Sequence, residues 1–399
     1  MIDIKTKAFW RATLALGAAA MMTFANLYFP QPLLPHFSES FGVSETTASL
    51  LVSVPLFVLG ITFFVYTALS DAFGRRPIIF TALGLGTLGT IAVSAAPTFE
   101  VMLAGRIFQA AGLAGIPVAA MAYISEEFKM RAMTVAVGAY ISCNSLGGMS
   151  GRVLSGVLTD IWNWRTAFIV MTVLSVILTV LVYMLLPRSQ EFQGRPLKLK
   201  TIIQDNKDHL ASPLLRGAYI IGGLHFLLFM GIFTFITYYL SQEPFHASTG
   251  ILGLLFLTYS AGTVSSTLAG KAAQRWKQTV CMFTGMACMA VSLAATLVPV
   301  FPVIIAALLL LCFGFFFTHS TSSAWVTRHA AHARASASGL YLTSYYIGGS
   351  LGSLYYGVLW TWLGWNAVIF GSFAILIITT IVTAGMKRME NQLPETGEG

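Results

Sequence analysis

A short charged stretch, Leu69-Ser70-Asp71-Ala72-Phe73-Gly74-Arg75-Arg76-Pro77, separates two long apolar segments of the chain. Residues 46–68 precede it and residues 78–96 follow it, and a helix of roughly 20 such residues crosses about 30 Å of hydrocarbon. Gly74 permits a tight turn, and Pro77 suits the first turn of the next helix. The sequence therefore predicts a short loop that joins two membrane spans.

The composition is that of a protein embedded in a membrane. The 399 residues are 56% hydrophobic and 10% charged, and the mean hydropathy of +0.76 excludes an ordinary soluble domain. Residues 9–35 are too long for the apolar core of a signal peptide, so we interpret them as the first span. Four cysteines fall inside predicted spans, where packing is their expected role and no metal-ligand spacing is seen: Cys143, Cys281, Cys288 and Cys312.

Apolar segments of suitable length predict an all-α integral membrane protein with twelve transmembrane helices. The predicted spans are 9–35, 46–69, 77–96, 99–124, 133–159, 165–187, 214–240, 249–270, 279–298, 302–326, 336–361 and 364–386. An even number of spans places both termini on the side of the charged loop. Of the 23 basic residues, 20 fall on that side, Arg165 falls opposite, and Arg106 and Arg152 lie inside spans.

This charge distribution predicts the orientation of the chain. Cytoplasmic loops accumulate Lys and Arg, so we expect a multi-pass protein of a bacterial cytoplasmic (inner) membrane with both termini in the cytoplasm. The formal net charge of +8 then reflects membrane topology, and no nucleic-acid partner is expected.

An internal repeat divides the chain into two halves. A shift of 201 positions aligns residues 138–164 with 339–365 without a gap, with nine identical pairs among 27. We therefore expect two pseudo-symmetric six-helix bundles. The predicted domains are an N-terminal bundle at 1–187, a cytoplasmic linker at 188–213 with a short amphipathic helix, a C-terminal bundle at 214–386 and a cytoplasmic tail at 387–399. Within the tail, Leu393 to Gly397 resembles a sortase signal but lacks the apolar segment that should follow, so we assign it no function.

The charged loop resembles the D-x-x-G-R-R pattern between the second and third spans of major facilitator superfamily transporters. The resemblance implies two pseudo-symmetric bundles with a substrate site near the membrane midplane. It also implies a cytoplasmic gate that opens and closes during transport, whereas the alternative is a loop that only holds the spans in place. The expected gate residues are Asp71, Gly74, Arg75 and Arg76, with Glu126, Glu127 and Arg131 of the next cytoplasmic loop as partners.

Two further motifs resemble those of the drug/proton antiporter branch of the superfamily. Arg106 and Gln109 match the R-x-x-Q-G-x-G pattern of the fourth span, with Ala110 in place of its first glycine. Residues 147–156 match G-x-x-x-G-P-x-x-G-G of the fifth, except that Arg152 replaces the proline and Ser155 the first glycine of the closing pair. An arginine inside a span costs about 2.5–3.5 kcal/mol and should face the protein interior. Arg106 is therefore either a substrate contact or a structural clamp on backbone carbonyls.

The two arginines lie at a similar depth, each eight residues from the external end of its span, so an anion between them would be stabilised. That anion could be the substrate or a carboxylate of Glu39, Glu45 or Asp160. No span carries a carboxylate in its middle. Asn26 and Gln31 of the first span are uncharged. This absence weakens a proton-coupling mechanism based on a buried acid.

Histidines and aromatic residues complete the candidate site. A cavity histidine with its ordinary pKa near 6.5 can exchange protons at physiological pH, so His319 and His225, with Glu127, are the proton-coupling candidates. A histidine that is only a hydrogen-bonded core residue is the alternative, as helix packing is for the aromatic residues. The expected substrate-binding residues are Asn26, Gln31, Arg106, Tyr123, Tyr140, Asn144, Arg152, Tyr238, Tyr341 and Tyr345.

The whole chain thus resembles the antiporter branch, and Ser125-Glu126-Glu127, residues 147–152, Asn163-Trp164-Arg165 and His319-Ser320 resemble its bacterial YnfM-type inner-membrane transporters. We expect a monomeric secondary transporter of small organic molecules that works by alternating access, with proton-coupled efflux. An organic-anion transporter using Arg106 and Arg152 is the alternative, and a membrane receptor or lipid flippase would be a different class. No nucleotide-hydrolysis or metalloprotease motif is present, so neither an enzyme nor a cofactor is expected.

Overall fold

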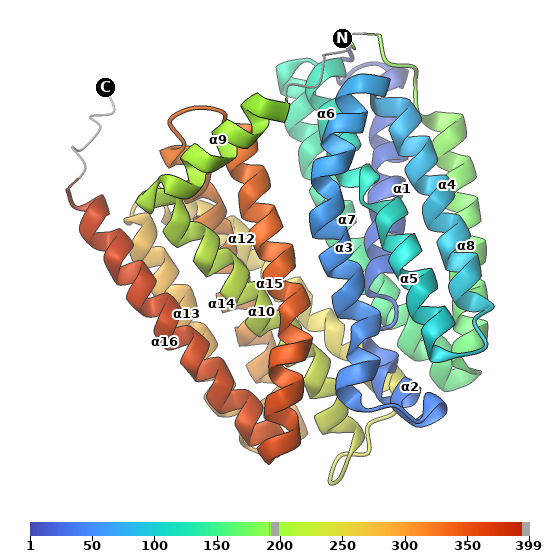
Figure 1. Ribbon diagram of the computed structural model, residues 1–399, viewed down its shortest axis with the longest axis vertical. Coiled ribbons are helices and arrows are strands. Elements are labelled where there is room, and N and C mark those ends of the chain that lie inside the picture. Colours follow the sequence, from blue (N-terminus) through green and yellow to red (C-terminus); the bar gives the residue numbers. More distant parts are fainter. Residues whose placement is uncertain (191, 193–198, 393–399) are drawn as a thin grey trace. The chain divides into compact units, whose positions relative to one another are not determined.

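The computed structural model describes residues 1–190, 192 and 199–392, and all regular structure in these residues is helical (Figure 1). Packing divides the chain into two compact units, which are residues Met1–Leu197 with Leu240–Phe256, and Lys198–Tyr239 with Leu257–Gly399. The short segment Leu240–Phe256 therefore packs in the first unit, although the chain on both sides of it belongs to the second.

The first unit is a bundle in which α1, α3, α4, α5, α7 and α8 run alongside one another (Figure 1). Its helices begin where the sequence supplies N-caps, because the side chains of Thr6, Ser44, Thr98 and Asn163 accept the backbone N–H three residues on. The elements are α1 (Lys7–Tyr28), η1 (Gln31–Leu33), α2 (Leu34–Phe41), α3 (Glu45–Phe73), α4 (Arg75–Ser94), α5 (Phe99–Leu113), α6 (Gly115–Glu127), α7 (Met130–Ile161), α8 (Trp164–Leu185) and α11 (Thr249–Leu254).

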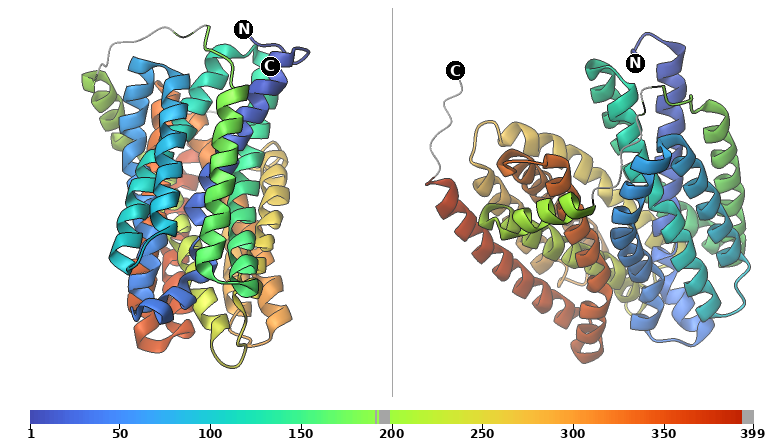
Figure 2. Two further views of the ribbon diagram at one scale, coloured as in Figure 1. Left: turned by 90° about the vertical axis from the view of Figure 1, so that its right-hand side faces the viewer. Right: turned by 45° about the horizontal axis from the view of Figure 1, so that its top comes forward.

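The second unit repeats this plan with an offset close to 201 residues. Trp164 and Trp365 are 201 residues apart and each begins a helix, and the offset also relates α4 to α13 and α7 to α15. Figure 2 gives two further views of both bundles. The elements are α9 (Leu199–Ala211), α10 (Pro213–Ser241), η2 (Leu255–Tyr259), α12 (Ser260–Ala272), α13 (Gln278–Ala295), α14 (Phe301–His329), α15 (Arg334–Leu363) and α16 (Trp365–Glu390).

Glycines allow the helices of each unit to approach closely. A Cβ on Gly147 would lie 2.4 Å from the Met21 carbonyl oxygen of α1, and its repeat mate Gly348 would meet the Gly223 carbonyl oxygen of α10 at 2.0 Å. No side chain fits at such distances, so both positions require glycine. Small-residue packing between helices is typical of membrane bundles, and it occurs at equivalent places in the two halves.

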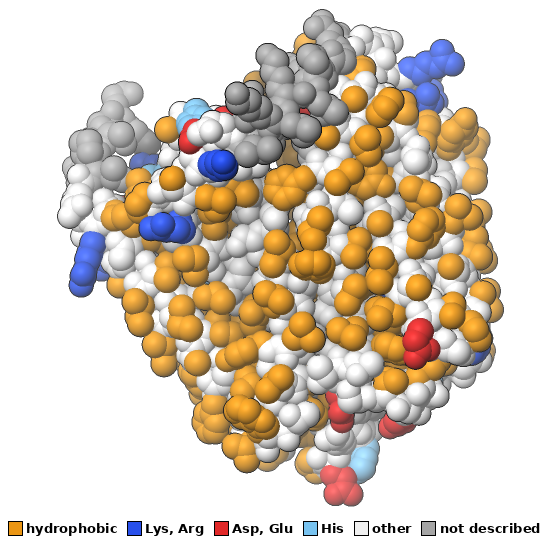
Figure 3. All heavy atoms as spheres, viewed as in Figure 1, with side chains coloured by type: hydrophobic (Ala, Val, Ile, Leu, Met, Phe, Trp, Pro, Cys, Tyr) orange, Lys and Arg blue, Asp and Glu red, His pale blue; other side chains and the backbone are white. Residues whose placement is uncertain are grey.

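Ten helical segments of the described chain are long and apolar enough to cross a membrane. The two remaining predicted spans, 133–159 and 336–361, coincide with α7 and α15, whose glycines and serines make them less apolar. Apolar side chains cover the flanks of the helices in the face shown in Figure 3, and charged side chains lie near helix ends. This distribution suits flanks that contact lipid.

Candidate functional site

The charged loop places one arginine between two carboxylates. Gly74 ends α3 with a φ of 95°, which favours glycine, and this turn directs Arg75 back along the helix. Its Nη1 donates to Asp71 Oδ1 at 2.6 Å and its Nη2 to Glu126 Oε1 at 2.6 Å. The Arg75 side chain is 8% exposed, whereas those of Asp71 and Glu126 are 35% and 30% exposed. We call these three residues the charged-loop cluster.

The other predicted partners of this loop make different contacts. Arg76 donates to the Leu186 carbonyl oxygen at 3.1 Å and lies over the Phe80 ring. Glu127 is buried and accepts the Gln190 backbone N–H at 2.8 Å. Within the described residues Arg131 is exposed and forms no side-chain hydrogen bond or ion pair. Glu126 therefore belongs to the charged-loop cluster, while Glu127 binds the Gln190 amide.

The N-terminal segment lies against the same helix end, a contact that the sequence did not indicate. Ile2 pairs with Phe128 in an isolated bridge, where its N–H donates to the Glu127 carbonyl oxygen at 2.6 Å. Lys129 donates to Asp3 at 3.0 Å, and this hydrogen bond and positive charge lower the pKa of Asp3. The end of α6 and the loop that follows it thus contact the N-terminal segment, the charged loop and the segment that follows α8.

Arg106 of α5 is fully buried and binds the backbones of two other helices. Its guanidinium donates to three carbonyl oxygens, those of Asn26 at 2.8 Å, Leu27 at 2.5 Å and Leu51 at 3.0 Å. In a regular helix the carbonyl of Asn26 would accept from residue 30 and that of Leu51 from residue 55. Both residues are prolines, which have no N–H. Arg106 therefore supplies the donors that Pro30 and Pro55 lack.

Polar side chains extend this clamp into a buried network. Arg106 also donates to Gln109 Oε1. Gln109 Nε2 in turn donates to Asn26 Oδ1 at 3.0 Å and Thr90 Oγ1 at 2.7 Å, and Asn26 Nδ2 donates to Ser175 Oγ at 2.9 Å. The network joins α1, α4, α5 and α8 and satisfies several buried polar groups, as stability requires. These contacts match the clamp alternative for Arg106 and place Asn26 in the clamp.

Arg152 of α7 is also buried, but aromatic rings surround it. Its guanidinium carbon lies 3.9 Å from the centre of the Tyr28 ring and 4.7 Å from that of Phe256. Its Nε donates to Gln31 Oε1 at 2.7 Å, and Nη1 donates to the Gly148 carbonyl oxygen at 2.8 Å. Cation–π contacts of this kind stabilise a desolvated arginine. Gln31 and Arg152, both among the expected substrate-binding residues, therefore contact each other directly.

Near Arg152, α7 packs tightly against α11. A Cβ on Gly156 would lie 2.4 Å from the Thr249 carbonyl oxygen and 2.8 Å from Gly253 Cα. One turn further, the hydroxyls of Ser248 and Thr249 donate to the Asp160 carboxylate at 3.0 and 3.4 Å. The contact between α7 and α11 therefore combines close backbone packing with hydrogen bonds to Asp160 at its end.

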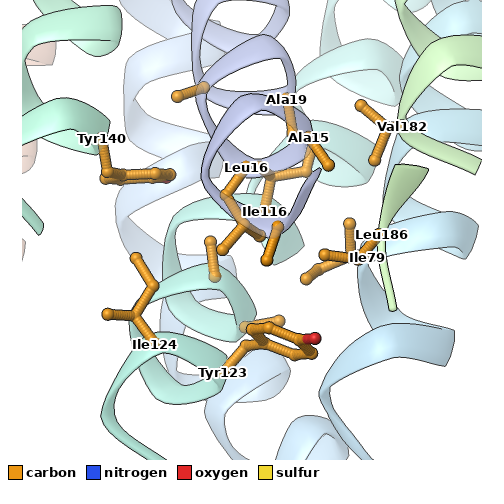
Figure 4. Packing of buried hydrophobic residues seen from close by; sticks show 14 of the residues in the cluster. Ala15, Leu16, Ala19, Ile79, Ile116, Tyr123, Ile124, Tyr140, Val182 and Leu186 are labelled. Carbon is orange, nitrogen blue, oxygen red and sulfur yellow. The ribbon is translucent and has the colours of Figure 1, made fainter. Parts of the chain in front are cut away.

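The predicted aromatic residues of the first unit lie in its core. Tyr123 and Tyr140 are buried in one hydrophobic cluster with Leu16 and Ile116, and Figure 4 shows their rings among these side chains. Tyr123 donates to the Pro187 carbonyl oxygen at 3.3 Å. In the described part of the chain, the Tyr140 hydroxyl and Asn144 Oδ1 have no hydrogen-bond partner. Tyr123 has the environment of a packing residue, whereas Tyr140 and Asn144 hold two unused polar atoms on successive turns of α7.

The second unit groups a histidine with two of the predicted tyrosines. His319 Nδ1 lies 3.0 Å from the Tyr341 hydroxyl, and its ring centre is 4.7 Å from that of Tyr345. Tyr345 stacks on Phe226 at 3.7 Å. The 201-residue offset relates Tyr341 and Tyr345 to Tyr140 and Asn144, so the two units present polar and aromatic groups at equivalent positions of equivalent helices.

The remaining predicted residues of this unit are separate from that group. His225 is buried on α10, where Nε2 lies 3.1 Å from the hydroxyl of Thr379. Tyr238 is buried beside Phe235 and Trp360. Among the residues that the structure describes, no group of three or more His, Cys, Asp or Glu side chains could hold a metal ion.

Comparison with known proteins identifies the family. The Major Facilitator Superfamily matches residues 16–353 and 226–396 of this chain. The chain belongs to that superfamily. It is 36% identical over 385 residues to the inner membrane transport protein YnfM of Escherichia coli K12, covering 96% of this chain and 91% of the relative. It is 32% identical over 390 residues to the uncharacterized MFS-type transporter YybF of Bacillus subtilis 168, covering 98% and 96%.

Solved structures of major facilitator proteins share the fold. A bacterial homolog of the human lysosomal transporter Spinster, crystallised in an inward-facing and unoccupied conformation, aligns with a TM-score of 0.76 at 14% identity, covering 96% of each chain. The chain is therefore a multi-pass membrane protein of a transporter family and not an enzyme, and a small-molecule substrate follows from that membership.

Several side chains of this major facilitator protein contact the predicted residues without any sequence signal that indicates it. Thr90, Ser175, Tyr28 and Phe256 contact the predicted residues but belong to no motif that we recognised. Gln109 stands in the R-x-x-Q pattern, so its place beside Arg106 could have been predicted from the sequence. The prolines at 30 and 55 carried a further signal, because a proline in a span leaves a carbonyl four residues earlier in need of a donor.

Proposed function

We propose that this protein is a proton-coupled secondary transporter that exports small organic molecules from the cytoplasm by alternating access. Family membership supports transport, and the strong bias of Lys and Arg to one side supports a cytoplasmic location of the charged loop and both termini. Proton-coupled efflux from a bacterial inner membrane is the finer part of the proposal. The monomer remains our expectation for its working state.

The observation that carries the proposal is the position of Arg75 between Asp71 and Glu126. A nearly buried guanidinium that loses both carboxylates becomes an uncompensated charge, which costs about 3–5 kcal/mol, and the loss of one carboxylate weakens the cluster toward that limit. Both carboxylates are about one-third exposed, so a proton or a moving helix can reach them. The charged-loop cluster thus suits a cytoplasmic gate that is stable when closed and opens when a carboxylate is neutralised.

The contact between α7 and α11 suits the opposite gate. It includes Gly156, Gly253 and the Asp160 hydroxyl contacts, at the helix ends farthest from the charged loop. Close glycine packing stabilises the contact without interlocking side chains, so α7 and α11 can move apart from each other. We propose that this contact closes the external side of the pathway.

Proton binding during the cycle is assigned to the histidines of the second unit. His319 is the stronger candidate because it contacts Tyr341 and Tyr345 on the helix equivalent to α7. His225, buried on α10 beside Thr379, is the second. Glu127 is less suited to this role, because the Gln190 amide already binds its carboxylate.

The proposal is tested by following pH inside proteoliposomes that contain a pH dye while organic anions and lipophilic cations are added in turn. We expect a substrate-dependent pH change with the intact protein and its loss in Asp71→Asn. Asp3→Asn is the matched control, since Asp3 is an exposed acid that pairs with Lys129 outside the charged-loop cluster. If compounds cross without any pH change, the proton-coupling proposal is wrong.

A further inference from the structure

The second unit has a basic depression at the helix ends equivalent to those of the charged-loop cluster. It has a volume of about 560 Å³ and is lined by Ala324, Thr327, Arg328 and Arg334, from the end of α14 and the start of α15. All four residues are exposed. The depression is shallow and largely open to solvent, so it can contact one charged group of a ligand but does not enclose a whole molecule.

The internal repeat shows why this depression is basic. The 201-residue offset places Thr327 at the position of Glu126 and Arg328 at that of Glu127. It also replaces Asp71 by Ala272 and Arg75 by Trp276. The second unit therefore has no equivalent of the ion pairs of the first, and a cation stands where the first unit has a carboxylate.

The positive charge of the depression is not neutralised in the described part of the chain. Neither Arg328 nor Arg334 forms an ion pair or a side-chain hydrogen bond there, and no acidic residue lines the depression. Asp205 and Asp208 of α9 are near, but they face the His332 ring at 3.8 Å each. The N-terminus of α15 adds the positive end of a helix dipole, since Ala333 provides no side-chain cap.

We propose that this depression binds the carboxylate or phosphate group of a transported organic anion at the cytoplasmic face. This inference rests on the proposed function and narrows its substrate to acidic molecules. Arg328 and Arg334 can donate charge-assisted hydrogen bonds to such a group. The depression is open to solvent, so an anion can reach both arginines, and their charge raises its local concentration. Arg106 and Arg152 are engaged by carbonyls and rings and are not needed for this step.

Direct binding tests the inference independently of transport. The probes are salicylate and inorganic phosphate, titrated into the purified full-length protein in a neutral detergent at constant ionic strength. We expect the dissociation constant to rise about tenfold or more in Arg328→Gln and in Arg334→Gln. Arg388→Gln is the control, because Arg388 is an exposed arginine of α16 outside the depression. Equal binding by the intact protein and the double variant would overturn the inference.

A lipid headgroup has the same chemistry and needs a separate experiment. The titration is repeated in nanodiscs of phosphatidylcholine alone and of phosphatidylcholine with phosphatidylglycerol. Unchanged salicylate binding supports a free organic anion, whereas its loss in the anionic nanodiscs assigns the depression to lipid and contradicts our inference.

Transport then links the depression to the substrate. In proteoliposomes, Arg328→Gln should raise the KM for an acidic compound at the cytoplasmic face, whereas Arg388→Gln should leave this KM unchanged. An unchanged KM would remove the substrate assignment. If the intact protein moves no protons, the proposed function fails, while the binding result still stands by itself.

Discussion

Arg106 illustrates how one side chain can compensate for defects in two helices. Pro30 and Pro55 each leave a carbonyl without its usual donor, and an unsatisfied buried polar group costs about 1–3 kcal/mol. The planar guanidinium of Arg106 reaches the carbonyls of Asn26 and Leu51 together. Lysine would supply only a compact charge without this fork of donors.

We predict that Arg106→Lys lowers stability by about 2–4 kcal/mol through the loss of charge-assisted hydrogen bonds. The measurement is thermal unfolding of the purified protein in detergent. Arg165→Lys is the control, because Arg165 donates to the Ala96 carbonyl and lies over the Trp164 ring at a partly exposed site. Similar losses in both variants would contradict the clamp.

The clamp also predicts coupling between Arg106 and Pro55. In Pro55→Ala the new N–H can donate to the Leu51 carbonyl, so this carbonyl depends less on Arg106. Arg106→Lys should therefore cost less in the Pro55→Ala background, by about 0.5–1.5 kcal/mol in a double-mutant cycle. Additive effects would show that Arg106 acts independently of the proline.

At the scale of helices, the contact of α7 with α11 depends on the absence of a side chain at Gly156. We predict that Gly156→Ala destabilises the protein by about 1–3 kcal/mol, because the new methyl group collides with the backbone of α11. It should also increase labelling of the external end by a membrane-impermeant reagent. Gly138→Ala on the same helix is the control, as its methyl group would meet nothing within 4 Å.

The helices also show what the sequence could and could not predict. Membrane spans follow from apolar length, and the charged loop follows from its D-x-x-G-R-R pattern, so the sequence alone indicates Asp71, Arg75 and Glu126. The partners of Arg106 are backbone carbonyls on other helices, which leave no residue-type signal at their positions. The rings around Arg152 come from residues 28 and 256, and only tertiary packing brings these together.

At the scale of the molecule, the charge distribution predicts topology. We expect N-terminal and C-terminal epitope tags to be digested by protease in inverted membrane vesicles and protected in intact spheroplasts. A tag inserted beside Arg165, the only basic residue predicted on the external side, should show the reverse pattern. Protection of either terminus in inverted vesicles would contradict the predicted orientation.

The packing of Leu240–Phe256 in the first unit has a consequence for the order in which the protein is made. When the ribosome has finished residues 1–197, Asp160 still lacks Ser248 and Thr249, and Arg152 still lacks one of its two rings. The first bundle can be completed only after α10 has been synthesised and inserted. A gene split at the linker would therefore yield an N-terminal fragment whose bundle lacks residues 240–256 until the second fragment binds to it.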